Sequence, residues 1–550
     1  MMRIRPSILY KISGLLIGGL IFFASCKPEN GKLENKQVFR YNEVNGIGSL
    51  DPAFAKDLAL INACEQLFNG LVQLDSNLIP APAIAKSWQL SEDFTVYTFT
   101  LNKGVYFHDN QCFYDSIGRR VVARDFIYSF NRILNNKIAS PGLWVFNMVD
   151  KNWKENGFYA PNDSVFQIKL KQAYTPFLSL LTMKYCSVIP YEAIEFYGDE
   201  FRNNPVGTGP FKLKYWEEGL KLVLIKNKKY FEKGLPYLDA ISISFLADKQ
   251  SEFLLFLQNK LDFISGFTPS LKDEILTENG ELRAKYINEF RMYKMPYLNT
   301  EYIGILVDTS LDIVKQSPLR NLAFRQALNY AIDKDKMLLY LQNNVGEAAH
   351  NGFIPTGLWP KEYPRAKGYS FQKEKAEKLL NKALKELNLD YFPSITLSAT
   401  NKSIDLCKYI QHEWSKFGIQ TEIELNQWAA LKEMVANSKV NLFRASWIAD
   451  YPDPENYLLL FDSFNFSPQG PNYTHFYSED YNLRLKNSNF AATLDEKYYS
   501  YRVMDSLILT NASVIPLYYD EVLRFVQPDI QGFSPNPMNL MVLKFVSTKN

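Results

Sequence analysis

The residues best suited to chemistry lie in the run FRASWIADYPDPENYLLLF, which extends from Phe443 to Phe461. This run places Arg444, Trp447 and Asp450 close together, and a further tryptophan, Trp428, precedes it. A carboxylate beside indole rings is suited to an ammonium group, because the anion accepts a charge-assisted hydrogen bond and the aromatic wall packs against the attached carbon. Free peptides carry such an ammonium, so the run predicts a binding site for a peptide amino terminus.

The same run contains three carboxylates that could instead serve catalysis. Asp450, Asp453 and Glu455 are candidates for the acid and base of a glycosidase, which needs two carboxylates flanking one bond. Neighbours in a proline-broken loop rarely face each other across a substrate. Asp453 before Pro454 favours a turn in which Asp453 caps the following helix, ENYLLLF. A hydrolase therefore remains an alternative, and we expect no catalysis.

Sequence motifs typical of metal sites, phosphate-binding loops and nucleophilic serines do not occur. The four histidines show no metal-ligand spacing, and His412-Glu413 lacks the second histidine of a zinc protease motif. There is no GxSxG and no GxxxxGK[ST] sequence. The cluster NPVGTGPF at 204–211 favours a tight turn between domains. We therefore expect neither a metal nor a cofactor.

Residues 1–25 have the three parts of a secretory signal. Arg3, Arg5 and Lys11 form the basic part, and the apolar stretch 12–23 is too short for a membrane span. The order Phe-Ala-Ser before Cys26 is similar to a bacterial lipobox, in which the cysteine is diacylated and the signal is removed. An ordinary signal with an incidental thiol is the alternative. We predict a lipid on Cys26, a tether over 26–38, and an extracytoplasmic, membrane-anchored location that faces the periplasm.

Charge and length narrow the possible classes of protein. Loss of residues 1–25 removes three basic and no acidic residues, so the formal net charge changes from +2 to −1. Without a basic block, nucleic acid is not an expected partner. The remaining chain is too long for one core and predicts two or three domains. Cys64, Cys112, Cys186 and Cys407 form no CxxC pair, and their pairing stays open.

Hydrophobic periodicity predicts a mixed α/β fold. Within Trp88–Phe107, alternation over Thr95–Leu101 followed by an Asn-Lys-Gly turn predicts a β-hairpin. The periodicity of Phe324–Leu341 predicts one core helix. Amphipathic helices are expected over Lys373–Leu389 and Lys402–Phe417. Gly418 ends the second of these before a strand. The repeated order of helix, glycine and strand favours α/β layers.

Seven landmarks in order resemble the extracytoplasmic peptide-binding proteins of ABC importers, the oligopeptide- and dipeptide-binding group. They are GSLDPA, NGLVQLD, PAIAKSWQLSEDFTVYTFTLNKGVYFHD, ARDFIYSF, NPVGTGPFKL, FRQALNYAIDKDKM and SWIADYPDPENYL. The resemblance covers almost the whole mature chain. It departs from the family at Asn110, at Asp308 and in about seven extra residues around CFYDSIG.

The resemblance implies a periplasmic-binding-protein-like α/β architecture with two lobes, a hinge and three domains. A discontinuous domain I is expected from 39–75, 205–297 and 518–550, domain II from 76–204, and domain III from 298–517. It also implies a monomer that captures peptides without catalysis and delivers them to ABC permease and ATPase subunits.

The resemblance assigns roles to individual residues of the site. Asp450 is expected to pair with the peptide ammonium, and Arg444 with its carboxylate. Trp447 and Trp428 match tryptophans that line side-chain pockets. The remaining ligand-binding residues are expected to contact the peptide backbone; they are Ser446 and Ile448 on one side, and Ala55, Lys56 and Asp57 as the opposite strand.

The sequence alone leaves several classes of ligand as alternatives. The same family includes receptors for nickel chelates, haem and oligosaccharides, and one sequence does not decide the pocket chemistry. A lipid-anchored hydrolase and a signalling receptor without a permease are further alternatives. Peptide length, side-chain preference and the membrane that holds the anchor are equally open.

Overall fold

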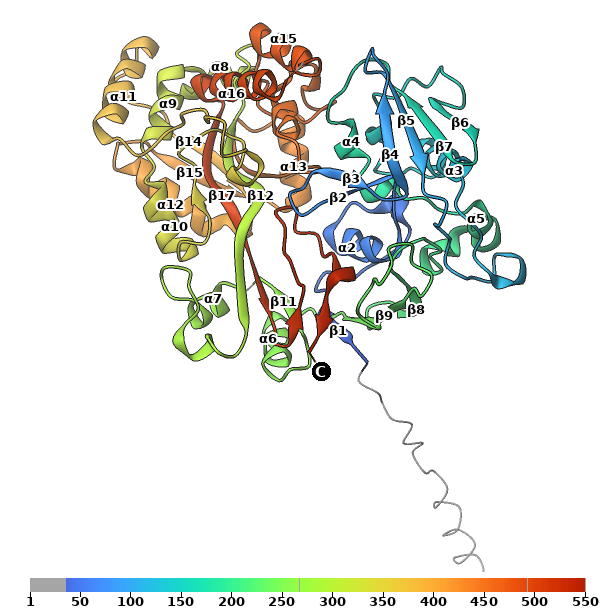
Figure 1. Ribbon diagram of the computed structural model, residues 1–550. Helices are drawn as coiled ribbons and strands as arrows, with labels where there is room; N and C mark the ends of the chain where they lie inside the picture. Colours follow the sequence, from blue (N-terminus) through green and yellow to red (C-terminus); the bar gives the residue numbers. More distant parts are fainter. Residues whose placement is uncertain (1–35, 267, 492, 550) are drawn as a thin grey trace, which may run out of the picture.

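The computed structural model describes residues 36–549 except 267 and 492. Figure 1 shows two lobes connected by the long strands β12 (Arg291–Ile305) and β17 (Val514–Val526). We call the part from β1 to residue 290, together with the segment after β17, the first lobe. The part from α8 to α16 is the second lobe. The expected signal sequence, Cys26 and most of the expected tether lie outside the described residues.

A mixed sheet of eleven strands runs through both lobes. Its order is β15-β14-β16-β12-β17-β11-β1-β10-β9-β8, and β13 pairs with β17 off this path. Parallel pairs such as β14–β15 and β1–β10 lie beside antiparallel pairs such as β12–β17, so the predicted mixed α/β class is confirmed. The remaining strands of this sheet are β15 Thr421–Leu425, β14 Ile395–Ala399, β16 Leu442–Ile448, β11 Phe263–Ser265, β1 Val38–Asn42, β10 Ala240–Ser244, β9 Lys221–Lys226, β8 Phe211–Glu217 and β13 Glu347–Ala348.

The ladder between β12 and β17 is interrupted where the two lobes meet. Its regular pairing stops at Pro296 and resumes at Thr300, and it shifts again after Glu301. Irregularities of this kind bend a strand and increase its local twist. The strands therefore bend beside residue 297, where the first segment boundary between domains I and III is expected.

A four-stranded antiparallel sheet forms the outer part of the first lobe. It contains β4 (Ala85–Leu90) and β5 (Val96–Leu101), with Trp88 opposite Phe99. The alternating strand is confirmed as β5, but its hairpin partner is β4, which precedes it. The expected hairpin about the Asn-Lys-Gly turn at 102–104 is wrong, because β5 pairs with β4 and β7 and not with a strand that follows this turn. The other strands outside the main sheet are β7 Val165–Lys169, β6 Phe158–Asn162, β2 Val72–Leu74, β3 Pro80–Pro82, β18 Ile530–Gln531 and β19 Ser547–Thr548.

Helices cover the sheets of both lobes, and most of the predicted ones are present. The second lobe confirms the helices expected over Lys373–Leu389 and Lys402–Phe417, and Gly418 follows with a positive φ of 76°. The α-helices are α2 Leu58–Leu67, α3 Ala123–Leu134, α4 Phe177–Leu180, α5 Tyr191–Tyr197, α6 Lys249–Leu257, α7 Pro269–Ile275, α8 Asp312–Lys315, α9 Leu322–Tyr330, α10 Lys334–Gln342, α11 Lys373–Leu387, α12 Ile404–Ser415, α13 Trp428–Ala436, α14 Glu455–Leu458, α15 Glu479–Ser488 and α16 Leu494–Asn511.

The single core helix expected over Phe324–Leu341 is wrong. Two helices, α9 and α10, occupy this segment and meet at Asp333. The Asp333 carboxylate accepts a hydrogen bond from the backbone N–H of Lys336 and so begins a new helix. The apolar periodicity continues across the break because both helices pack against the same core.

The turn expected at 204–211 packs tightly against the end of α2. A Cβ at Gly209 would lie 2.4 Å from the carbonyl oxygen of Gln66, and one at Gly207 would lie 2.1 Å from that of Leu67. These approaches leave no room for a side chain. The glycines therefore serve close backbone packing within the first lobe.

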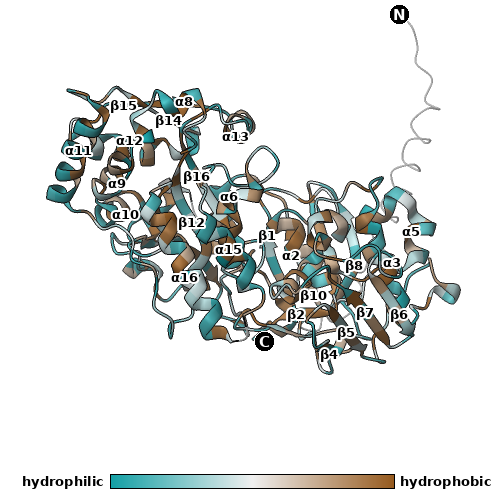
Figure 2. Ribbon diagram, turned by 90° about the horizontal axis from the view of Figure 1, so that it is seen from above, coloured by the Kyte–Doolittle hydropathy of each residue, from teal (hydrophilic) through white to brown (hydrophobic). Residues whose placement is uncertain are grey.

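Each lobe has its own apolar core, and a few side chains pack across the junction between them. A large buried cluster fills the first lobe, while two further clusters fill the second. Tyr451, from the loop after β16, belongs to the cluster of the first lobe. Figure 2 shows the mainly hydrophilic colouring of α11 at the far end of the second lobe. Within the described residues, Cys64, Cys112, Cys186 and Cys407 are free thiols, and no helix is long and apolar enough to cross a membrane.

Candidate ligand-binding site

Strand β16 presents a partly unpaired edge next to the predicted site. One edge pairs with β12 along its whole length, whereas β14 reaches only Leu442 and Phe443 on the other edge. Ala449 N–H donates to the Leu298 carbonyl of β12 at 2.8 Å, so the alternate residues Ser446 and Ile448 direct their backbone groups away from β12. Among the described residues, nothing pairs with the backbone groups of these two residues on this edge, so they can bind an added peptide strand.

Asp450 lies just beyond this edge, where the chain turns. Its side chain is exposed to solvent, yet the surrounding protein desolvates the carboxyl and raises its pKa, while a side-chain hydrogen bond with Asn456 lowers it. Within the described residues, no lysine or arginine forms an ion pair with Asp450. A partly desolvated carboxylate without a cation is suited to a cationic ligand group.

Asn456, which was not predicted from the sequence, orients two groups that were, the Trp447 indole and the Asp450 carboxylate. Its side-chain oxygen accepts hydrogen bonds from the Trp447 indole N–H at 2.9 Å and from the Asp450 backbone N–H at 3.2 Å. The Asn456 side chain is buried, and Trp447 is half-buried. One amide thereby fixes the indole plane and the turn that carries the carboxylate.

The first lobe lies directly against this turn. Burial raises the pKa of the Tyr185 hydroxyl, and the negative charges of Asp450 and Asp57 raise it further, so both carboxylates lie near this phenol. The rings of Trp144 and Tyr451 lie 6.2 Å apart. Asp450 therefore lies at the junction of the two lobes, as the expected cleft requires.

The other two carboxylates of the run are buried in a separate network. Glu455 is fully buried and accepts hydrogen bonds from the hydroxyls of Tyr451 and, at 3.1 Å, of Tyr174 in the first lobe. Burial raises the pKa of Glu455 to about 7, and the charge of Asp453 adds to the effect. Asp453 forms an ion pair with Lys497 at 2.8 Å and accepts from the Glu455 backbone N–H. Asp453 therefore does bind the first turn of α14, and both carboxylates already have protein partners.

Arg444 already has a carboxylate partner. Its guanidinium forms an ion pair with the buried Glu301 of β12, which also accepts from the Asn299 side chain at 3.1 Å. Arg444 lines a cavity of about 510 Å³ between the lobes, together with Asp520. A ligand carboxylate at Arg444 would meet two acidic residues, which weakens the role that the resemblance implies for this arginine.

Trp428 and the segment Ala55–Asp57 complete the set of predicted residues. Trp428 begins α13 and is 61% exposed, so it is not a core residue. Ala55 is buried and Lys56 is exposed. Asp57 caps α2 through the backbone N–H of Leu60 at 3.0 Å. The segment forms no strand of any sheet, and it links a short 3-10 helix, η1 (Pro52–Phe54), to α2.

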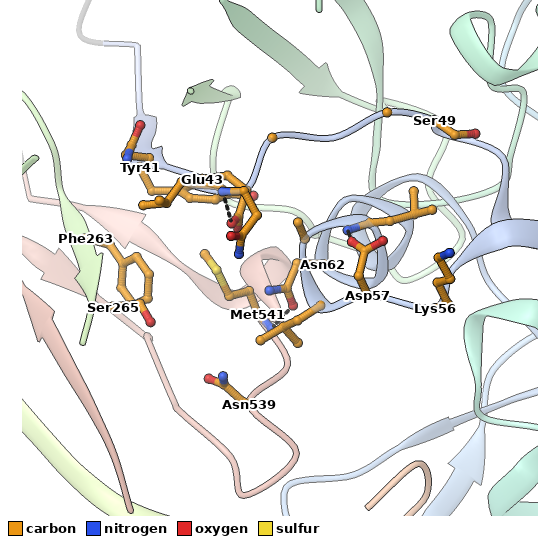
Figure 3. A pocket seen from close by; sticks show the side chains of 18 of the residues that line it. Tyr41, Glu43, Ser49, Lys56, Asp57, Asn62, Phe263, Ser265, Asn539 and Met541 are labelled. Carbon is orange, nitrogen blue, oxygen red and sulfur yellow. Dashed lines mark hydrogen bonds between the residues drawn. The ribbon is translucent and has the colours of Figure 1, made fainter. Parts of the chain in front are cut away.

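A cavity of about 720 Å³ opens beside Lys56 and Asp57 in the first lobe. Figure 3 shows these two side chains on one side of it, and Tyr41, Phe263 and Ser265 on the other. Its walls combine aromatic surface with charged groups. No group of three or more potential metal ligands occurs within the described part of the chain.

Two lobes that share long strands, with one cavity between them and another in the first lobe, are typical of a two-lobed ligand-binding protein. The chain belongs to the bacterial extracellular solute-binding proteins of family 5, whose model matches residues 80–468. The family description places its members outside the cytoplasm, as the sequence predicts.

Individual relatives match nearly the whole chain. The periplasmic oligopeptide-binding protein OppA of Salmonella typhimurium is 24% identical, with 96% of each chain covered. Heme-binding protein A of Haemophilus influenzae is also 24% identical, covering 93% of this chain and 92% of its own. The unliganded open form of MppA, a periplasmic murein tripeptide-binding protein, is 22% identical with a TM-score of 0.76, covering 94% of this chain and 98% of its own. The expected two-lobed fold is thereby confirmed.

Proposed function

We propose that this protein captures peptides between its lobes and delivers them to the permease and ATPase subunits of an ABC importer, without catalysis. The observation that carries this proposal is the Asp450 carboxylate, which is partly desolvated and has no cationic partner within the described chain. The oligopeptide and murein-tripeptide relatives support the same class of ligand.

The peptide backbone supplies the second part of the binding energy. Ser446 and Ile448 offer free backbone groups at the edge of β16, so a ligand can add as a further strand. Lys56 and Asp57 line the facing cavity of the first lobe. Trp447 and Trp428 provide aromatic walls for side chains of many kinds. This arrangement binds groups that every peptide has, as a transport receptor of broad specificity requires.

Closure of the lobes strengthens the ammonium contact. We place the bend between domains I and III at the interrupted ladder of β12 and β17, with the domain segments 39–75, 205–297 and 518–550, then 76–204, then 298–517. When the lobes close, water leaves the site and the charge pair gains strength in a lower dielectric. The closed, ligand-bound form then differs in shape from the empty, open form, so the permease can bind the closed form selectively.

The amino-terminal segment completes the proposal. A lipid on Cys26 would hold the monomer on a membrane facing the periplasm, with β1 beginning only twelve residues later at Val38. Mass spectrometry of the protein from bacterial membranes tests this point. A mature mass that includes a diacylated Cys26 is expected, and a soluble chain cleaved elsewhere would contradict it.

The test of the function is native mass spectrometry of the protein as purified, followed by calorimetry. We expect co-purified peptides, and micromolar or tighter binding of short peptides by the emptied protein. N-acetylated versions of the same peptides serve as the matched control, because they lack the ammonium. A co-purified haem, nickel chelate or oligosaccharide, or equal binding of acetylated peptides, would overturn the proposal.

A further inference from the structure

The loop 109–118 of the first lobe holds apolar side chains in water. It contains the extra residues CFYDSIG, by which the chain departs from the family pattern. Tyr114 is 90% exposed and Ile117 is 58% exposed. The base of the loop is fixed, because Phe113 is buried against Phe107 with the ring centroids 6.0 Å apart. A fixed loop with an exposed apolar tip is suited to a surface that contacts a partner.

The base of this loop contacts a lysine-rich segment, 211–233, which includes β8 and β9. Lys229 forms an ion pair with Asp109 at 2.7 Å. Partial burial raises the pKa of Asp109, but hydrogen bonds and the charges of Lys229 and Lys212 hold it below its usual value. Lys212 therefore also lies near the base of the loop.

The segment 211–233 carries an excess of positive charge. It has seven lysines and three glutamates. Two of the glutamates pair with residues outside the segment, Glu232 with Lys544 at 2.7 Å and Glu218 with Arg202 at 3.7 Å. Five of its lysines are partly or fully exposed and form no ion pair within the described residues: Lys212, Lys214, Lys226, Lys228 and Lys233. We call these five lysines, together with Tyr114 and Ile117, the membrane face.

The strand register places these lysines beside the point where the described chain begins. Val38 on β1 pairs with Ala240 on β10. Ala240 pairs with Ile225 on β9, which pairs with Lys212 on β8. At about 4.8 Å per strand, Lys212 lies about 14 Å from Val38. All four share the sheet face turned away from the core, because the alternate residues, such as Phe39, are buried in it. Figure 1 shows β1, β9 and β8 together at one end of the first lobe.

The chain before β1 keeps this end close to a membrane when Cys26 carries the proposed lipid. Ten residues, 27–36, separate Cys26 from Gln37, and they span at most about 35 Å when fully extended. The Gln37 carbonyl accepts a hydrogen bond from the Asp239 N–H at 2.8 Å, and the Asp239 carbonyl accepts one from the Lys226 N–H at 2.9 Å. The tether therefore leaves the fold directly beside the lysines.

We propose that the membrane face binds anionic phospholipids of the membrane to which the chain is tethered. The lysines contact the headgroup phosphates, to which basic clusters near a membrane are attracted. Tyr114 lies at the boundary of headgroups and acyl chains, where tyrosine is favoured, and Ile117 enters beside it. Binding orients the first lobe on the bilayer and adds a second anchor to the lipid. This inference goes beyond the proposed function and does not depend on the ligand.

Helix α11 of the second lobe is also rich in lysine and supplies a control surface. Two of its lysines pair with glutamates one turn further on, Lys373 with Glu377 at 3.9 Å and Lys382 with Glu386 at 3.6 Å. The helix lies far from β1 at the other end of the molecule (Figure 1). Lysines exchanged on α11 therefore alter the net charge without altering the membrane face.

The first test is cosedimentation of the chain from Lys27, which keeps every described residue, with lipid vesicles. We expect binding to phosphatidylglycerol vesicles at low ionic strength, little binding to phosphatidylcholine, and release in high salt, which screens the charges. The pair Lys226→Glu and Lys228→Glu is expected to weaken binding about tenfold or more. The pair Lys378→Glu and Lys385→Glu on α11 makes the same change in net charge and is expected to weaken it less than about twofold.

The second test concerns the loop. Tyr114→Ser with Ile117→Ser is expected to weaken binding to phosphatidylglycerol vesicles several-fold and to leave its salt dependence unchanged, because no charge is removed. Both side chains are exposed, so the variant should fold like the wild type. In the lipidated protein, backbone hydrogen exchange over 109–118 is expected to be slower in phosphatidylglycerol than in phosphatidylcholine vesicles.

Three results would overturn the proposal. The first is a chain that does not bind phosphatidylglycerol vesicles. The second is an equal loss of binding in the α11 variant and in the β9 variant, because net charge alone then accounts for the attraction. The third is binding to native membranes but not to pure lipid, because the surface then fits a membrane protein. Equal exchange of the loop in both kinds of vesicle would remove Tyr114 and Ile117 from the membrane face. None of these results affects the calorimetry of peptides, so failure here is distinguishable from failure of the proposed function.

Discussion

Asp450 and Glu455 lie five residues apart in one loop and have opposite surroundings. Asp450 reaches solvent at the junction of the lobes and has no cation within the described chain. Glu455 is fully buried and satisfied by the hydroxyls of Tyr174 and Tyr451. Burial raises the pKa of both carboxyls, but only Asp450 leaves room for a ligand. A raised pKa therefore does not by itself distinguish a ligand-binding carboxylate from a structural one. The presence or absence of protein partners for the carboxylate does.

The largest effect is expected from Asp450→Ala on peptide binding. Removal of one partner of a desolvated charge pair costs about 2–5 kcal/mol, so affinity should fall at least tenfold in calorimetry. Asp450→Asn, which removes only the charge, is expected to lose nearly as much. The free energy of unfolding should change by less than about 0.5 kcal/mol, because the side chain is exposed. Unchanged affinity would remove Asp450 from the site.

Glu455→Ala should show the reverse pattern. Two buried tyrosine hydroxyls lose their acceptor, which is expected to lower the free energy of unfolding by about 2–3 kcal/mol in urea titration. Glu455→Gln keeps an acceptor oxygen and should lose clearly less. An alanine variant as stable as the wild type would show that this network is not structural.

The pH dependence of stability tests the burial of Glu455. The pKa of Glu455 rises from 4.5 to about 7 on folding, so the folded state holds its proton more tightly than the unfolded state. Its contribution is fully present below pH 4.5 and is lost as the pH rises through about 7. The stability of the wild type relative to Glu455→Gln should thus fall by about 1–3 kcal/mol between these values, measured by urea titration at each pH. A constant difference would contradict the raised pKa.

The smallest effect is expected from Trp428→Ala. Its side chain is 61% exposed, so stability should change by less than about 0.5 kcal/mol. If Trp428 forms a wall of a side-chain pocket, peptides with large apolar residues should bind several-fold more weakly in calorimetry, whereas tri-alanine should bind equally well. Trp428→Phe is the control that keeps an aromatic wall. Equal loss for all peptides would exclude a pocket role.

Local patterns in the sequence predicted individual elements of both lobes. The alternation over Thr95–Leu101 and the amphipathic pattern of Lys373–Leu389 depend on neighbours in sequence, and the strand and the helix are both present. The break at Asp333 was missed because the apolar periodicity of α9 continues in phase into α10. A capping aspartate inside a periodic run was the available signal.

Partners distant in sequence could not be predicted in the same way. Arg444 and Glu301 are separated by 143 residues, and Tyr174 and Glu455 by 281. No local pattern reports such pairs, so the sequence could suggest Arg444 as a ligand contact without showing that its charge is already neutralised.

The insertion of Tyr451 into the core of the first lobe limits how the lobes can move. The shared strands connect the lobes at the interrupted ladder, and the buried Tyr451 ring adds a contact at the loop after β16, where Glu455 also accepts a hydrogen bond from Tyr174. A motion that pulled this loop away from the first lobe would expose the Tyr451 ring to water, at a cost in free energy. Opening that leaves the ring in place therefore costs less than a separation of the lobes at this loop.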